Sequence, residues 1–156
     1  AVDVCKHLGK RLIIAGQGIP PEYGEYVGVD GTEERAKLMG GAIAVFTPTI
    51  YVEPFGTVAI EAMACGTPVI STDWGAFTET VIDGVTGYRC HTLQEFVDAA
   101  EQVKSLSRQA ISQYAKNRYG LKTVALMYEK YFTRLQTLWG SGWYEINKSI
   151  IDTGDI

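Results

Sequence analysis

The sequence predicts an α/β fold, Rossmann-like and three-layered with a mostly parallel sheet, from three observations in one stretch. Residues 42–46 form a short apolar run typical of a strand buried on both faces, and a Thr-Pro pair stops it. From Thr57 the residues suit a helix, and Gly66 occupies the position where a left-handed residue ends one. A proline then prevents the helix from continuing, and Val69-Ile70 open a second buried strand. Strand, helix and strand in this order indicate parallel pairing.

The first forty residues are expected to form a helix, two short strands and a second helix, over residues 2–8, 11–15, 26–29 and 32–40. Gly9 is the expected stop of the first helix, and Thr32 is the expected cap of the second, whose first turn is acidic. A strand that follows a helix in a parallel sheet normally pairs with a strand before that helix. None precedes residue 2, so we expect a chain that is truncated at its N-terminus.

After Gly87 the pattern becomes helical, with apolar side chains recurring at three- and four-residue steps; these are Leu93, Phe96, Val97, Ala100, Val124, Met127, Tyr128, Tyr131 and Leu135. We expect both stripes to be core, and Gly120 to divide the second helix of this part from the third. The main domain is expected to span residues 1–138, and residues 139–156 to form a tail whose last residues fray. The aromatic residues from Trp139 to Tyr144 predict self-association.

Composition limits the class of protein. At 156 residues and 46% hydrophobic, the chain suits one domain with a real core. A net charge of -4 argues against nucleic acid as a partner. The sequence shows neither a long apolar run nor a signal peptide, so no membrane segment is expected. Three cysteines, without paired spacing, suggest reduced thiols in the cytoplasm. Cys5 and His7 are close in sequence, but with His91 as the one other histidine no metal site is expected.

The segment around Thr57 also predicts chemistry. A helix that begins there leaves its first N–H groups unpaired and carries about half a positive charge, which suits a phosphate. Gly56 lets a ligand approach the backbone closely. Glu61 lies one turn into the helix with its side chain leaning back, and Glu53 lies in the preceding loop. Two acceptor carboxylates beside a phosphate seat suit a nucleotide sugar, which has hydroxyl groups on both sides of its diphosphate.

At these residues the sequence resembles a known family. Residues 53–56 and 61–69 resemble the E-x7-E signature of retaining glycosyltransferases of the GT-B fold, most closely glycosyltransferase family 4. The resemblance includes G-G-x-x-E and D-G-x-x-G segments at residues 75–79 and 83–87, with Ala in place of the second glycine of the first segment. It also includes a strand ending in G-x-G, at residues 13–18, and covers roughly residues 8 to 135. It implies the donor-binding, C-terminal half of the GT-B fold.

The resemblance implies roles for individual residues. Glu53, the expected catalytic residue, would hold hydroxyl groups of the donor sugar without attacking it, and Glu61 would bind the ribose hydroxyls. Other donor-binding positions are the backbone from Phe55 through Gly56 and Thr57 to Val58, the hydroxyl residue Thr49, and the glycine Gly16. From the residues alone, Glu61 could also be part of a solvated helix face and Glu53 an ordinary loop acid. Glu79 is left out, because it can equally brace its own short helix.

The implied function is transfer of a hexose from a nucleoside diphosphate sugar to an acceptor, with retention and without a bound metal or cofactor. In the family, an N-terminal acceptor domain and a strand with an Arg and a Lys complete the site. Both are expected to be missing here, so this chain alone would not transfer the sugar. Between Lys37 and Arg89 the chain has no Lys or Arg, so cations for the diphosphate are expected from elsewhere. The alternatives are a sugar-nucleotide epimerase of the same fold and a non-catalytic nucleotide-binding module. The base, sugar and acceptor leave no readable trace.

Overall fold

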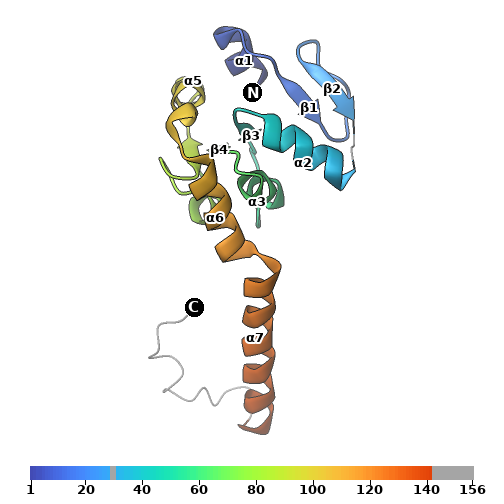
Figure 1. The fold of residues 1–156 in the computed structure, drawn as a ribbon, viewed down its shortest axis with the longest axis vertical. Coiled ribbons are helices and arrows are strands. Elements are labelled where there is room, and N and C mark those ends of the chain that lie inside the picture. The colour runs from blue at the N-terminus through green and yellow to red at the C-terminus, as the bar shows by residue number, and fades with distance from the viewer. Residues whose placement is uncertain (29–30, 142–156) are drawn as a thin grey trace. The chain divides into compact units, whose positions relative to one another are not determined.

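The computed structural model describes residues 1–28 and 31–141, with the side chains of 137–141 left aside (Figure 1). The chain forms two compact units, Ala1–Lys116 and Asn117–Ile156. The boundary expected between residues 138 and 139 lies inside the last helix, α7 (Leu121–Ser141), which continues across it.

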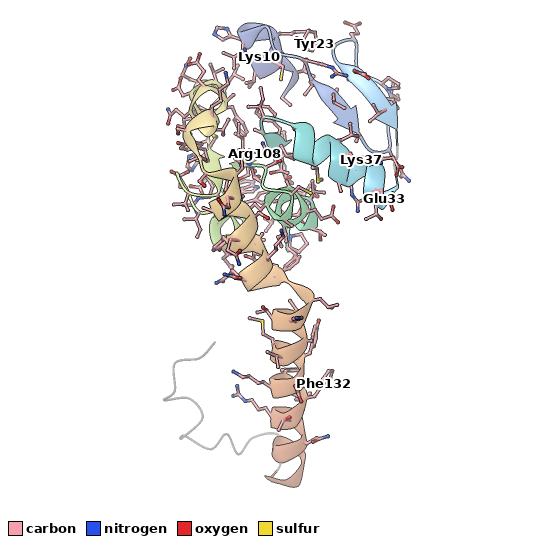
Figure 2. The ribbon with its side chains drawn as sticks, viewed as in Figure 1. Lys10, Tyr23, Glu33, Lys37, Arg108 and Phe132 are labelled. Carbon is pink, nitrogen blue, oxygen red and sulfur yellow. The ribbon has the colours of Figure 1, made fainter. Side chains whose placement is uncertain are left out.

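The first unit opens with α1 (Val2–Leu8), which ends at Gly9 in the left-handed conformation, as expected. Strands β1 (Ile13–Ala15) and β2 (Glu25–Gly28) pair in parallel and form a sheet of their own. The hydroxyl group of Tyr23 donates to the carbonyl oxygen of Lys10 at 2.9 Å (Figure 2), which ties the connection between these strands to the end of α1.

Helix α2 spans Thr32–Gly41, so it begins at the residue that was expected to cap it. The capping residue is Gly31, in an extended conformation, and no side chain caps the helix. Thr32 is therefore the first helical residue and not the cap, which corrects the sequence prediction. Arg108 (Figure 2) closes the other end of α2 by donating to the carbonyl oxygens of Gly40 (2.6 Å) and Ala42 (2.8 Å).

The second sheet contains three parallel strands in the order β3-β4-β5, which are Val45–Thr47, Val69–Thr72 and Gly87–Cys90. The helices around it are α3 (Thr57–Ala64), α4 (Phe77–Thr80), α5 (Leu93–Gln102) and α6 (Arg108–Tyr119), with a 3-10 turn at Val103–Ser105. Strand β5 was not predicted, because its Gly-Tyr-Arg-Cys sequence lacks the apolar run that reveals the two strands beside it.

The second sheet is the middle layer of three. On one face, Phe46 and Ile70 pack with α1 and α5. On the other face, Val69 packs with α2, α3 and α6, and with Phe77 of α4. Because neighbouring side chains of a strand point to opposite faces, each buried strand contributes to both cores. The predicted α/β architecture with parallel strands is confirmed, although the strands form two hydrogen-bonded sheets.

The second unit is described as far as Ser141 and contains α7, which begins directly after Gly120 as expected. Three members of its apolar stripe, Met127, Tyr128 and Tyr131, are each more than half exposed, so the prediction that this stripe is core is wrong. The aromatic side chains from Trp139 to Tyr144, and the fraying expected near the terminus, lie outside the described residues. Within the described part of the chain, no helix combines the length and hydropathy that crossing a bilayer requires.

Candidate functional site

The candidate site begins at the carboxyl end of β3, where the loop of residues 48–56 leads into α3. Gly56 precedes the helix with φ 78° and ψ 48°, a left-handed conformation that favours glycine. Its carbonyl oxygen accepts from the N–H groups of Ala59 (3.0 Å) and Ile60 (3.3 Å). Thr57 and Val58, both exposed, come before these two, so their N–H groups lie at the open end of the helix. The predicted start of α3 at Thr57 and the left-handed Gly66 after its end are confirmed.

Glu53 lies in the loop before this helix end, as predicted, and its carboxylate accepts hydrogen bonds from that loop. Its Oε1 accepts from the N–H groups of Gly56 (3.0 Å) and Phe55 (3.4 Å), and its Oε2 accepts from the hydroxyl group of Tyr51 (2.9 Å). The hydrogen bond from Tyr51 lowers the pKa of the Glu53 carboxyl, partial burial opposes this, and the bonds from Gly56 and Phe55 add to it. The group is thereby held as a carboxylate, which accepts hydrogen bonds and does not donate a proton.

The segment after β4 fixes the backbone that carries Glu53. The N–H group of Ala76 donates to the carbonyl oxygen of Glu53 at 2.8 Å. A Cβ atom on Gly75, whose φ is +60°, would lie 2.6 Å from the nitrogen and 2.7 Å from the oxygen of the Glu53 backbone. Trp74 extends the contact, because its Nε1 donates to the carbonyl oxygen of Tyr51 at 3.0 Å. The two loops at this edge of the sheet therefore position the Glu53 carboxylate together.

The backbone of Thr49 also holds this loop in place. Its carbonyl oxygen accepts from the hydroxyl group of Thr72 at 2.8 Å, and its N–H group donates to Thr47 at 2.9 Å. The side-chain oxygens of Thr47 and Ser71, which are register partners on β3 and β4, are buried without a hydrogen-bond partner in the described part of the chain. The carboxyl ends of these two strands thus carry unpaired hydroxyl groups as well as the loop that holds Glu53.

Glu61 lies one turn into α3 and makes a forked ion pair that sequence reasoning missed. The Nε of Arg35 lies 3.1 Å from its Oε2, and the Nη2 of Arg35 donates to its Oε1 at 3.1 Å. The two side chains are 42% and 35% exposed, so the pair remains open to solvent. Nothing in the spacing of the sequence links Arg35 and Glu61. Consecutive helices of an α/β fold tend to pack side by side, as α2 and α3 do, and this tendency is the signal that could have found the pair.

Gly16 lies apart from the β3 loop in sequence and in sheet, at the end of β1. Its φ of 135° favours glycine, and open space surrounds the position of a Cβ. Its N–H group donates to Gly28 at 2.7 Å, and its carbonyl oxygen accepts from the hydroxyl group of Tyr26 at 2.7 Å. Both backbone groups of Gly16 are therefore already engaged within the β1–β2 pair.

The described residues also form a hollow away from the β3 loop. This hollow of about 220 Å³ is lined by residues of β5 and α5 and by Asp83, and it includes none of the candidates named above. Three of its lining residues are acidic, which does not suit a phosphate, so we assign the site to the β3 loop, where N–H groups and carboxylates converge. Among the described residues, no three His, Cys, Asp or Glu side chains gather closely enough to hold a metal ion.

Comparison with known proteins identifies the family. The model of the family described as "Glycosyl transferases group 1" matches residues 25–118, which is more than half of the chain. The chain belongs to this family. The family match covers α2, β3, α3 and the loop that carries Glu53, and so contains most of the candidate site.

Curated relatives of this glycosyltransferase chain are longer proteins. A probable sucrose-phosphate synthase of Thermosipho melanesiensis is 39% identical over 114 residues, which cover 62% of this chain and 27% of the relative. A D-inositol 3-phosphate glycosyltransferase of Kribbella flavida is 47% identical over 114 residues, covering 59% of this chain and 27% of the relative. The chain therefore spans about a quarter of the length of these relatives.

Solved structures support the same fold. AviGT4, a glycosyltransferase involved in avilamycin A biosynthesis, superposes with a TM-score of 0.70 at 26% identity, over 86% of this chain and 46% of AviGT4. Anabaena Alr3699/HepE, solved in complex with UDP-glucose, gives 0.73 at 20% identity, over 85% of this chain and 44% of that protein. The expected fold class, the α/β donor-binding half of a GT-B glycosyltransferase, is confirmed.

Proposed function

We propose that this glycosyltransferase chain binds a nucleoside diphosphate sugar at the start of α3, as the donor-binding part of a retaining hexosyltransferase. One observation carries the proposal: the open N-terminal end of α3 is flanked by the carboxylates of Glu53, on the N–H groups before the helix, and of Glu61, one turn along it. The likeness to Anabaena Alr3699/HepE, whose structure contains UDP-glucose, supports a donor of this class.

The diphosphate would lie against the N–H groups of Thr57 and Val58, where the helix dipole favours negative charge. There the site would stabilise the charge that develops on the departing diphosphate, which is the electrostatic form of catalysis. Glu53 would contribute as an acceptor. Each carboxylate oxygen offers two lone pairs; Oε1 already accepts from Gly56 and Phe55, whereas Oε2 accepts from Tyr51 and has one lone pair left for a hydroxyl group of the sugar.

On the nucleotide side, Glu61 would accept hydrogen bonds from the ribose hydroxyls. Thr49 and Gly16 also belong to the proposal, Thr49 through the loop that positions Glu53, and Gly16 through the open space at the end of β1, which lets a ligand approach the backbone without a new hydrogen bond. Because the chain spans about a quarter of its curated relatives, we propose that acceptor contacts come from the remaining length of such proteins. The chain by itself would then bind the donor without transferring the sugar.

Isothermal titration calorimetry with UDP, GDP, ADP and UDP-glucose tests the proposal. We expect one nucleotide to bind, and Glu61→Ala to weaken its binding by roughly tenfold or more, since a hydrogen bond to a charged group contributes about 1.5 to 3 kcal/mol. Glu53→Gln should weaken UDP-glucose more than UDP, because its expected partner is the sugar. Glu79→Ala, an exposed acid on α4, is the matched control and should bind as the wild type does. Absence of binding to every one of these ligands at millimolar concentration would refute the proposed function.

A further inference from the structure

The ion pair between Arg35 and Glu61 suggests how the ribose site is organised. Arg35 is the fourth residue of α2, and its guanidinium meets the Glu61 carboxylate of α3 through two different nitrogens, each 3.1 Å from a different oxygen. A guanidinium that binds both oxygens in this way fixes the plane of the carboxylate as well as its position. A single point charge would fix neither.

The remaining hydrogen-bonding capacity of Glu61 suits a hydroxyl group of the ribose. A carboxylate has two lone pairs on each oxygen, and Arg35 uses one on Oε1 and one on Oε2. One lone pair is left on each oxygen, both in the same plane and on the sides turned away from the guanidinium. Because these two lone pairs lie on opposite edges of the carboxylate, two neighbouring hydroxyl groups cannot reach both, and one ribose hydroxyl group can donate to one of them. Because the Glu61 side chain is 35% exposed, such a ligand can reach it.

The charge distribution also singles out Arg35. From residue 38 to residue 88 the chain contains no Lys or Arg, so the loop and helix that form the candidate site contribute no cation of their own. The ion pair brings one to α3 from the preceding helix. From the sequence, cations for the diphosphate are expected from elsewhere, and Arg35 is not among the candidate residues.

We propose that Arg35 is a positioning residue for ribose recognition: it holds the Glu61 carboxylate so that one of its free lone pairs accepts from a ribose hydroxyl group. The inference rests on the proposed donor site and adds a residue to it. Arg35 acts through Glu61 and not on the diphosphate. Its effect therefore depends on the ribose hydroxyls and on the forked geometry, and retaining the positive charge is not sufficient.

The test compares two ligands, namely whichever of UDP, GDP and ADP binds most tightly, and the analogue of that nucleotide that lacks both ribose hydroxyls. Calorimetry gives the ratio of their dissociation constants for the wild-type chain and for Arg35→Gln, Arg35→Lys, Glu61→Gln and the double variant Arg35→Gln/Glu61→Gln. Lys37→Gln is the matched control, since it removes one positive charge from an exposed position of the same helix (Figure 2). Thermal melting checks each fold; a surface pair contributes little to stability, so all variants should fold.

We expect the wild-type chain to prefer the intact nucleotide by at least about tenfold. Arg35→Gln and Arg35→Lys should each reduce this ratio below about threefold, because an ammonium group cannot replace the fork. Lys37→Gln should preserve the ratio, and Arg35→Gln should cause no further loss when Glu61 is already Gln.

Three results would overturn the inference while leaving the donor site in place: a wild-type ratio in Arg35→Lys, an additive loss in the double variant, or tighter nucleotide binding in Arg35→Gln, which would make Arg35 a competitor of the ribose. A wild-type ratio in Glu61→Gln, or absence of nucleotide binding by the wild-type chain, would instead overturn the ribose assignment itself, and the inference with it.

Discussion

Replacing Gly75 by Ala tests whether the segment after β4 positions Glu53. The new Cβ would lie 2.6 Å from the Glu53 nitrogen, whereas ordinary contact begins near 3.4 Å, so the two backbones must separate by 3.4 − 2.6 = 0.8 Å. Backbone atoms cannot rotate away as a flexible side chain can. The φ of +60° adds a left-handed penalty of about 1 to 2 kcal/mol, and the overpacking adds about 1 to 3 kcal/mol. We therefore expect a loss of about 2 to 5 kcal/mol in the free energy of unfolding.

Gly84 offers a matched control, because its φ is +70° and nothing lies within 4 Å of the position of its Cβ. Gly84→Ala measures the left-handed penalty alone, about 1 to 2 kcal/mol. Urea unfolding at equilibrium gives the free energy for both variants and the wild type. Calorimetry with UDP-glucose gives the second measurement; we expect at least about tenfold weaker binding in Gly75→Ala, since displacements near 1 Å are costly at a site, and wild-type binding in Gly84→Ala.

Equal losses of stability in the two variants would show that the contact with Glu53 can be relieved at no cost. Wild-type binding of UDP-glucose by Gly75→Ala would show that the backbone position of Glu53 does not matter to the ligand. Either result would refute the reasoning that joins the two loops into one site.

Four further predictions concern the framework of the fold. Gly87→Ala would bring a Cβ within 1.9 Å of the carbonyl oxygen of Val69 and force β4 and β5 apart; we expect a loss of more than about 3 kcal/mol by urea unfolding, and near-native stability would contradict the pairing. Arg108→Met should cost about 1 to 3 kcal/mol, because the carbonyl groups that end α2 lose charged donors; an unchanged urea midpoint would show that water replaces them. Burial raises the pKa of the Cys90 thiol to about 12, so at pH 8 a thiol-specific disulfide reagent should modify the partly exposed Cys65 first. The raised pKa also makes the free energy of unfolding depend on pH. The contribution of the Cys90 thiol is complete below pH 9 and should be lost as the pH rises from 9 toward 12, because the thiol of the unfolded chain ionises first. Equal stability at pH 8 and pH 11 would contradict this prediction.

Local chemistry explains why the central part of the fold could be predicted. The limits of α3 follow from Gly56 and Gly66, which supply left-handed residues at its two ends, and from Pro68 beyond it. The strands β3 and β4 are apolar because both of their faces are covered. Strand β5 was missed because its sequence, Gly-Tyr-Arg-Cys, contains Arg89 and has no continuous apolar run.

The apolar stripe of α7 shows the opposite error. Periodicity indicates that a helix has an apolar face, but it does not indicate what covers that face. Met127 and Tyr131 satisfy the pattern and are nevertheless more than half exposed in the structure.

The sequence by itself determined the class of fold, the helix end that suits a phosphate, and the two carboxylates beside it, because each depends on residues that are neighbours along the chain. Only the tertiary structure decided what those two residues contact. The carbonyl oxygen of Glu53 accepts from Ala76, which lies 76 − 53 = 23 positions away, and the Glu61 carboxylate meets Arg35, which is twenty-six positions away. Contacts across such separations depend on how helices pack on a sheet, and packing is a property of the whole chain that no local pattern encodes.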